Sequence, residues 1–90
     1  MNKSELIKAI ADATETSQAS VNELINALTD VITKAVANDN DVVLTGFGKF
    51  YRASRKATTG RNPQTGAEIQ IPAAKLPKFK AGKKFKDEVK

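Results

Sequence analysis

The chain has 90 residues and a net charge of +5, and it contains neither cysteine nor histidine. This length predicts one small domain, residues 1–90, while the composition excludes disulfides, cysteine catalysis and the commonest metal ligand and general base. No apolar run approaches the roughly 18 residues of a membrane span, and the charged N-terminus does not resemble a signal peptide. We therefore expect a cytoplasmic protein with no membrane partner, metal or cofactor, and the lack of a catalytic constellation argues against an enzyme.

The charge is divided unequally along the chain. Residues 1–45 hold three lysines against seven acidic residues, a net charge of −4. Residues 46–90 hold twelve lysines and arginines against three acidic residues, a net charge of +9. A basic half of this density predicts a polyanionic partner, most often nucleic acid, whereas the alternative is a solvated lysine surface.

Two helices are expected in the acidic half. The first covers residues 2–13, where Asn2 is placed to cap the helix and Glu5 completes a capping-box pattern. Its apolar stripe consists of Leu6, Ile7, Ile10 and Ala11. Ser17 and Ser20 both fit as the cap of the second helix, and the sequence leaves the choice between them open.

The second helix carries a broad apolar stripe at three- and four-residue spacing. The stripe consists of Val21, Leu24, Ile25, Leu28, Val31, Ile32, Ala35 and Val36. It is wider than packing against one short helix requires. A helix-turn-helix is the alternative, but a recognition helix needs side chains that reach bases and phosphates, and this helix has only Lys34 as a cation. We therefore interpret the helix as core and interface.

Strands are expected in the basic half, after a turn at residues 37–41. "DVVLT" predicts a short strand and "GFGKFYRAS" a second, with Gly46 and Gly48 indicating a tight turn or bulge between them. "KLPKFK" predicts a third sheet strand, which Pro77 places at an edge or beside a bulge. A short C-terminal helix follows, with Phe85 and Val89 on one face. The order ααβββα predicts an α+β fold.

The stretch "NPQTG" is typical of a hairpin tip. Pro63 pre-sets φ, and Gly66 can adopt the left-handed conformation that closes a four-residue loop. The flanking strands, about residues 55–61 and 67–73, predict a ribbon arm roughly 20 Å long at ~3.3 Å per residue. Ile69 and Ile71 share one face of this arm with no partner in the chain, and an isolated ribbon is marginally stable in water. We therefore expect a ligand to hold the arm.

A nucleic-acid groove suits the arm. Its cations would meet phosphates, and they are Arg55, Lys56 and Arg61. Ile69 and Ile71 would lie against sugars, while Pro63 would act as a rigid apolar wedge between base pairs. The alternative is an ordinary exposed hairpin, which the turn residues alone favour and the surrounding charge disfavours.

Four stretches of the chain carry a family resemblance: the motifs "GFGKF" and "RKATTGRNPQT", the opening "MNKSELI" and the closing "PKFKAGKKFKDEVK". They resemble the HU/IHF family of bacterial histone-like DNA-bending proteins, and HU most of all. The resemblance covers the whole chain. It implies an intertwined dimer in which residues 1–45 of each chain form a helical base. Residues 46–90 of each chain would form a three-stranded antiparallel sheet, an extended β-ribbon arm and the last helix. DNA kinking by a minor-groove wedge is described for this family itself.

The resemblance also implies roles for individual residues. The arm tip would consist of Arg61, Asn62, Pro63, Gln64 and Thr65, with Pro63 as the intercalating residue. The flanks of the bound DNA would meet Lys3, Lys83 and Lys86, and phosphates near the arm base would meet Lys75, Lys78 and Lys80. The dimer interface and core would include Leu6, Leu24, Ile25, Leu28, Ile32, Val36, Phe47, Phe50 and Phe79. Lys49 and Arg52 are not assigned to the interface.

Two positions depart from the family pattern. Thr58 stands where some members carry a cation, which predicts weaker arm contacts. Arg52 stands where an apolar residue is common, which predicts a polar rim at the sheet.

Three functions follow from these patterns. The first is a homodimeric, largely sequence-nonspecific protein of the bacterial nucleoid that bends and compacts double-stranded DNA and prefers bent, nicked or flexible DNA. The second is a site-specific subunit similar to integration host factor, which pairs with a paralogue. The third is RNA or ribosome binding, because a basic surface does not choose its polyanion.

Overall fold

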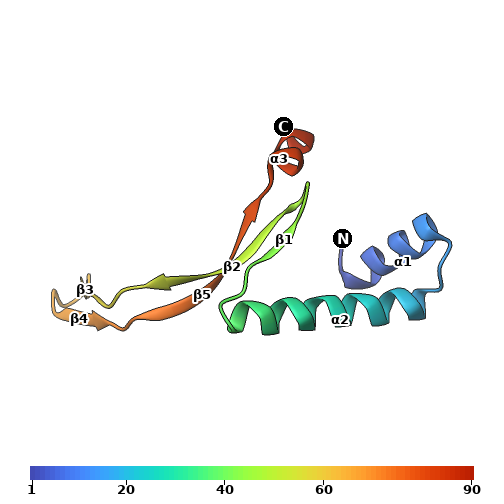
Figure 1. The fold of residues 1–90 in the computed structure, drawn as a ribbon. Helices are drawn as coiled ribbons and strands as arrows, with labels where there is room; N and C mark the ends of the chain where they lie inside the picture. The colour runs from blue at the N-terminus through green and yellow to red at the C-terminus, as the bar shows by residue number, and fades with distance from the viewer. The chain divides into compact units, whose positions relative to one another are not determined.

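The computed structural model describes residues 1–90 as two compact units, Met1–Lys34 and Ala35–Lys90. Figure 1 follows the chain through α1 (Lys3–Thr14), α2 (Gln18–Ala37), β1 (Val42–Leu44), β2 (Gly48–Arg55), β3 (Thr58–Arg61), β4 (Glu68–Ile71), β5 (Ala74–Ala81) and α3 (Lys83–Val89). This order confirms the predicted α+β class, with two helices first, then strands, then a closing helix. None of the helices combines the length and hydropathy that crossing a membrane requires.

Helix α1 begins as its sequence predicts. The Asn2 side chain accepts a hydrogen bond from the Glu5 backbone N–H at 2.9 Å, which satisfies one of the free donors of the first turn. Along the helix, Ile7 and Ala11 are buried and pack with Val21 of α2. This cluster is the hydrophobic core of the first unit.

Helix α2 begins after Ser17, which settles the choice of cap. The Ser17 Oγ accepts from the Ser20 N–H at 3.2 Å, and the Ser17 carbonyl accepts from the Val21 N–H at 3.1 Å. Beyond this point one side of α2 is open to solvent, with Leu24 and Leu28 65% and 45% exposed. The stripe is therefore only partly used within the chain.

The second unit is built on a three-stranded antiparallel sheet in the order β1-β2-β5. Gly46, with φ +85, turns the chain between β1 and β2, and the Phe47 N–H donates to the Leu44 carbonyl at 2.9 Å. Strand β5 is an edge strand, which confirms the position predicted from Pro77. A proline is tolerated there because its missing N–H would face away from the sheet.

Gly48 serves close packing, and its conformation is not that of a turn. It is the first residue of β2, and a Cβ built there would lie 2.4 Å from Cζ of Phe79. Phe79 in turn contacts Phe47 and Phe50, with ring centroids 5.3 and 4.8 Å apart, and Phe85 stacks on Phe47 at 4.8 Å. The four phenylalanines of the chain form one cluster, although Phe47 and Phe79 are 44% and 38% exposed.

The arm is a separate two-stranded sheet, β3-β4, and its strands are shorter than predicted. The three-stranded sheet ends at the pair Arg55–Ala74, and the arm begins at the pair Thr58–Ile71. Pro72 lies between these pairs and has no N–H to donate to the opposite strand. The predicted continuous strands 55–61 and 67–73 were therefore wrong at this break, which separates the arm from the sheet.

Arg52 joins the end of α2 to the sheet. Its Nη1 donates to the Ala37 carbonyl at 3.2 Å, and its Nη2 lies 3.5 Å from the Asp39 carboxylate. The carbonyls of the last helical turn have no partners within the helix, so the guanidinium satisfies one of them. This contact lies within the second unit, which includes the last residues of α2.

Candidate nucleic-acid interface

The three-stranded sheet has one basic face and one aromatic face. Because side chains alternate along a strand, the register assigns each position to a face. The basic face carries Val43, Lys49, Tyr51, Lys78 and Lys80, and the aromatic face carries Val42, Phe50, Arg52, Lys75, Pro77 and Phe79. Lys78 and Lys80 therefore act from one face, whereas Lys75 is on the other.

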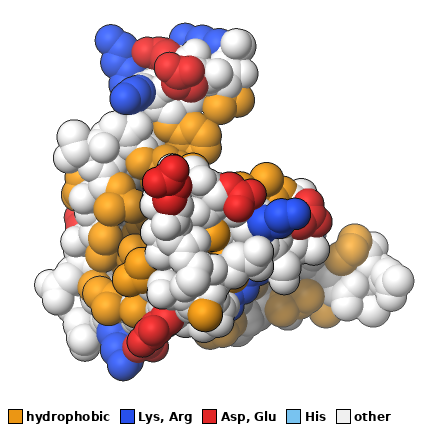
Figure 2. Space-filling model, turned by 90° about the vertical axis from the view of Figure 1, so that its right-hand side faces the viewer, with side chains coloured by type: hydrophobic (Ala, Val, Ile, Leu, Met, Phe, Trp, Pro, Cys, Tyr) orange, Lys and Arg blue, Asp and Glu red, His pale blue; other side chains and the backbone are white.

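An open concavity of about 680 Å³ lies where the sheet meets α3. Five lysines line it: Lys49, Lys80, Lys83, Lys86 and Lys90. Asp87 is the one acidic residue in the lining. Figure 2 shows Lys and Arg side chains at the top of the molecule, where α3 lies, with acidic side chains among them. Lys80, Lys83 and Lys86, all expected to contact DNA, are brought together here, and a concave surface of this charge attracts a polyanion.

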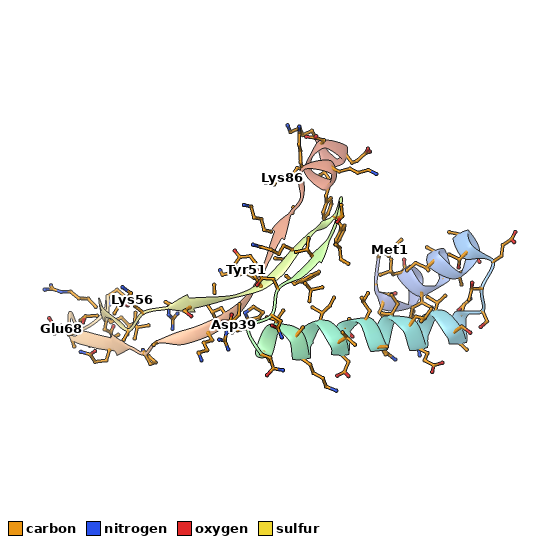
Figure 3. The ribbon with its side chains drawn as sticks, viewed as in Figure 1. Met1, Asp39, Tyr51, Lys56, Glu68 and Lys86 are labelled. Atoms are coloured by element: carbon orange, nitrogen blue, oxygen red, sulfur yellow. The ribbon has the colours of Figure 1, made fainter.

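A second hollow, of about 530 Å³, marks the junction of sheet and arm. Arg55, Lys56 and Lys75 supply its charge, so Lys75 joins the arm-base cations although it points away from Lys78. Arg55 also donates from Nη2 to the Pro72 carbonyl at 3.1 Å, across the break between sheet and arm. Figure 3 shows Lys56 on the arm side of the sheet, far from Lys86 on α3.

The arm itself has an apolar and a polar face. The pairs Thr58–Ile71 and Gly60–Ile69 form the first, as expected from the spacing of the two isoleucines. Ile71 does find a partner within the chain, because a Cβ on Gly60 would lie 3.2 Å from its Cδ1. Ile69 remains 45% exposed.

The polar face of the arm places opposite charges side by side. Arg61 pairs directly with Glu68 across the two strands. Glu68 is the single acidic residue in the stretch 55–73, and Figure 3 shows it near the end of the arm. A cross-strand carboxylate offsets part of the positive field that Arg61 would offer to a phosphate.

The arm tip is the predicted four-residue loop. The Asn62 N–H donates to the Ala67 carbonyl at 2.9 Å, and Pro63 to Gly66 lie inside this closing bond. Gly66 has φ +71, the left-handed conformation that its sequence position predicts. Pro63 therefore sits on an ordered turn.

Lys3 belongs to the first unit, where its Nζ donates to the Asn26 side-chain oxygen. This bond leaves the ammonium charge unneutralised, since the acceptor is an amide. The chain holds no group of three or more His, Cys, Asp or Glu side chains suited to a metal ion.

Two lysines of the concavity beside α3 were not assigned to the interface from the sequence: Lys49 was set aside, and Lys90 was not considered. Lys49 lines the concavity beside α3, lies 3.9 Å from the Asp41 carboxylate and sits 5.1 Å from the centre of the Tyr51 ring. Lys90 lines the same concavity. The alternation of Lys49 and Tyr51 was a usable signal, because i and i+2 share a face in a strand.

The profile of the family described as bacterial DNA-binding protein matches residues 1–90, the full chain. The chain belongs to the HU/IHF family of bacterial DNA-binding proteins. Among HU/IHF relatives, HU-beta 2 of Neisseria meningitidis is 49% identical over 89 residues, covering 99% of this chain and 98% of its own. HU-1 of Halalkalibacterium halodurans is 50% identical over 90 residues and both chains are covered completely.

The fold is also similar to solved HU structures. The Anabaena HU chain in a cocrystal with DNA has a TM-score of 0.91 and 39% identity, covering 99% of this chain and 97% of that one. HU from Thermotoga maritima has a TM-score of 0.71 and 29% identity over the full length of both chains. These matches confirm the family and the α+β fold that the motifs indicated.

Proposed function

We propose that this protein is a homodimeric, largely sequence-nonspecific architectural protein that bends and compacts double-stranded DNA in the bacterial nucleoid. One observation carries the proposal: a thin β-arm extends from the sheet (Figure 1), with Pro63 at its tip and lysines along one face of the sheet. The full-length family match and the similarity to an HU chain cocrystallised with DNA support it.

Exposed apolar side chains support the dimer. Leu24, Leu28 and Val31 lie at i, i+4 and i+7 on α2 and are 65%, 45% and 63% exposed. Fully burying an exposed side chain of this kind contributes about 1.5–3 kcal/mol, and covering these partly exposed ones would contribute roughly half of that each. A second copy that covers this stripe and the open side of the phenylalanine cluster would complete the core, as the small number of buried residues requires.

Charge supports binding to the DNA backbone. The cations of the two hollows are spread along the second unit from α3 to the arm base. Each phosphate that they neutralise releases counterions, so affinity is expected to fall steeply as salt rises. Contacts of this kind position the protein on the duplex and do not read its sequence.

Pro63 supports bending. It sits at the tip of an arm whose first strand, β3, carries small residues (Thr58, Thr59 and Gly60), and its ring is rigid and apolar. In this family of proteins such wedges unstack one base step and kink the duplex, at a cost of a few kcal/mol. A nick or a flexible step lowers that cost, so preference would follow deformability and not base identity.

The deciding experiment is a salt-dependent titration on three DNAs, with the bend followed by end-to-end energy transfer. The DNAs are a random duplex, the same duplex with a nick, and a candidate site flanked by A-tracts. The proposal expects similar affinity for the intact duplexes, tighter binding to the nick and a large bend. Preference for one intact sequence by about 10³-fold would favour a site-specific heterodimer subunit. A paired titration on RNA that gave tighter binding than DNA would favour the RNA-binding alternative.

Replacing Pro63 with alanine isolates the wedge. The variant is expected to bind with nearly unchanged affinity, because phosphate contacts remain, and to bend DNA much less. Equal energy transfer for the variant and the wild type at saturation would refute the wedge role.

A further inference from the structure

The arm tip contains more hydrogen bonds than closing the loop requires. Two backbone bonds close it, from the Asn62 N–H to the Ala67 carbonyl at 2.9 Å and from the Gly66 N–H to the Asn62 carbonyl at 2.7 Å. The Asn62 side chain adds a third, because its Oδ1 accepts from the Gln64 N–H at 2.9 Å. The Thr65 Oγ1 accepts from the Ala67 N–H at 3.3 Å.

The side-chain bond of Asn62 spans Pro63. An asparagine that accepts from the backbone N–H two residues later forms an Asx turn, which fixes the residue between them. Here the residue between is the proline, whose φ is already set by its ring. The Asx turn restrains the remaining backbone angle, ψ, of Pro63. Together the ring and the bond set the direction in which the proline points.

This bond also limits what Asn62 can offer to DNA. Asparagine reads bases through a donor and an acceptor together, and its Oδ1 is already engaged within the turn. The Nδ2 group and one lone pair of Oδ1 remain available to a partner, but the turn fixes the direction of Oδ1.

We propose that Asn62 is a positioning residue for Pro63: its side-chain oxygen holds the tip so that the proline ring enters the duplex at a fixed angle. This inference rests on the proposed wedge function. It assigns Asn62 an effect on the bend that acts through Pro63, and little effect on affinity or sequence preference.

Three substitutions separate the acceptor from the rest of the side chain. Asn62→Ala removes the bond. Asn62→Ser restores an acceptor, because a serine hydroxyl can accept the same backbone hydrogen bond. The resulting turn is weaker than the asparagine turn. Pro63→Ala removes the wedge and serves as the reference for a lost bend.

The assay is end-to-end energy transfer on the nicked duplex at saturating protein, with affinity measured separately. Losing a hydrogen bond of ordinary strength is expected to lower the ratio of kinked to unkinked complex about fivefold. Asn62→Ala should therefore bend the DNA less than wild type does, and Asn62→Ser should recover part of the bend. The double variant Asn62→Ala/Pro63→Ala should bend the DNA no less than Pro63→Ala alone. Comparing the bend of every variant at saturation keeps it separate from any change in affinity. The Gln64 amide of the free protein should exchange faster with solvent in Asn62→Ala than in Asn62→Ser.

Two results would overturn the inference while the wedge stands. One is a wild-type bend for Asn62→Ala when Pro63→Ala bends less. The other is an equal loss for Asn62→Ala and Asn62→Ser with unchanged Gln64 exchange, which would assign the effect to Nδ2. If Pro63→Ala itself bends as wild type does, the proposed wedge fails, and the inference fails with it.

Discussion

Replacing Gly48 with alanine tests how tightly the phenylalanine cluster is packed against β2. The added Cβ would lie 2.4 and 2.5 Å from Cζ and Cε2 of Phe79 and 2.7 Å from the Lys80 carbonyl oxygen. The ring can rotate away only by disturbing its contacts with Phe47 and Phe50. The carbonyl cannot move without shifting β5, because Lys80 pairs with Lys49 next to Gly48.

The size of the effect follows from these contacts. Overpacking of this kind costs about 1–3 kcal/mol, and contact with a backbone atom favours the upper end of that range. Alanine restricts the unfolded chain and returns about 0.4–1 kcal/mol. A net loss of about 2 kcal/mol corresponds to a fall in Tm of about 8–16 °C for a domain of this size.

Thermal melting by circular dichroism measures this shift, with wild type and variant at equal protomer concentration because an oligomer's Tm depends on concentration. Gly66→Ala is the matched control, since it makes the same chemical change at a position with no atom within 4 Å. Its φ of +71 introduces strain only at the arm tip, so its melting should shift much less. A Gly48→Ala Tm within about 2 °C of wild type, or an equal fall in Gly66→Ala, would refute the packing argument.

Two further predictions concern charged residues. Arg52→Met should lower the free energy of unfolding by about 1 kcal/mol in urea, because it removes one hydrogen bond to Ala37 and a partly exposed ion pair with Asp39. A loss of DNA affinity without a loss of stability would contradict this structural role. Glu68→Gln should raise DNA affinity about threefold at low salt, with the gain vanishing at high salt, because it removes the negative charge of the residue that pairs with Arg61 across the arm. Equal affinities of Glu68→Gln and wild type at low salt would show that the carboxylate does not matter.

Local chemistry made much of the fold predictable. The Asn2 cap, the turn at Gly46, the edge position of Pro77 and the loop closed by Gly66 each depend on a few neighbouring residues. Such features can be read from sequence because the conformational preference is a property of the residue itself. The family motifs extended this reading to the arm.

Features that depend on residues distant in sequence were not predictable. The break between sheet and arm requires knowing that Pro72 and Ala73 lie opposite Lys56 and Ala57. The close approach of Phe79 to Gly48 depends on the register of β5, which no local pattern specifies.

Arg52 shows the same limit for function. Its charge was counted with the basic half of the chain. The guanidinium lies on the aromatic face of the sheet, where it contacts the Ala37 carbonyl and the Asp39 carboxylate at the end of α2. The polar rim at the sheet stays a prediction. Register, which assigns each side chain to a face, was the missing information.

The same reasoning estimates how much the two hollows contribute to the salt dependence of binding. The second half of the chain holds twelve lysines and arginines, and eight of them line the two hollows. If each of the eight neutralised one phosphate, the hollows would contribute about −7 per protomer to the slope of log affinity against log salt, and contacts by Arg61 and Lys78 would add to it. Arg52 is outside both hollows, so Arg52→Met should leave this slope unchanged, whereas Lys75→Gln should make it shallower by about 1. A slope that Arg52→Met reduces by the same amount would mean that DNA displaces Ala37 and Asp39 from the guanidinium, and that binding loosens the end of α2.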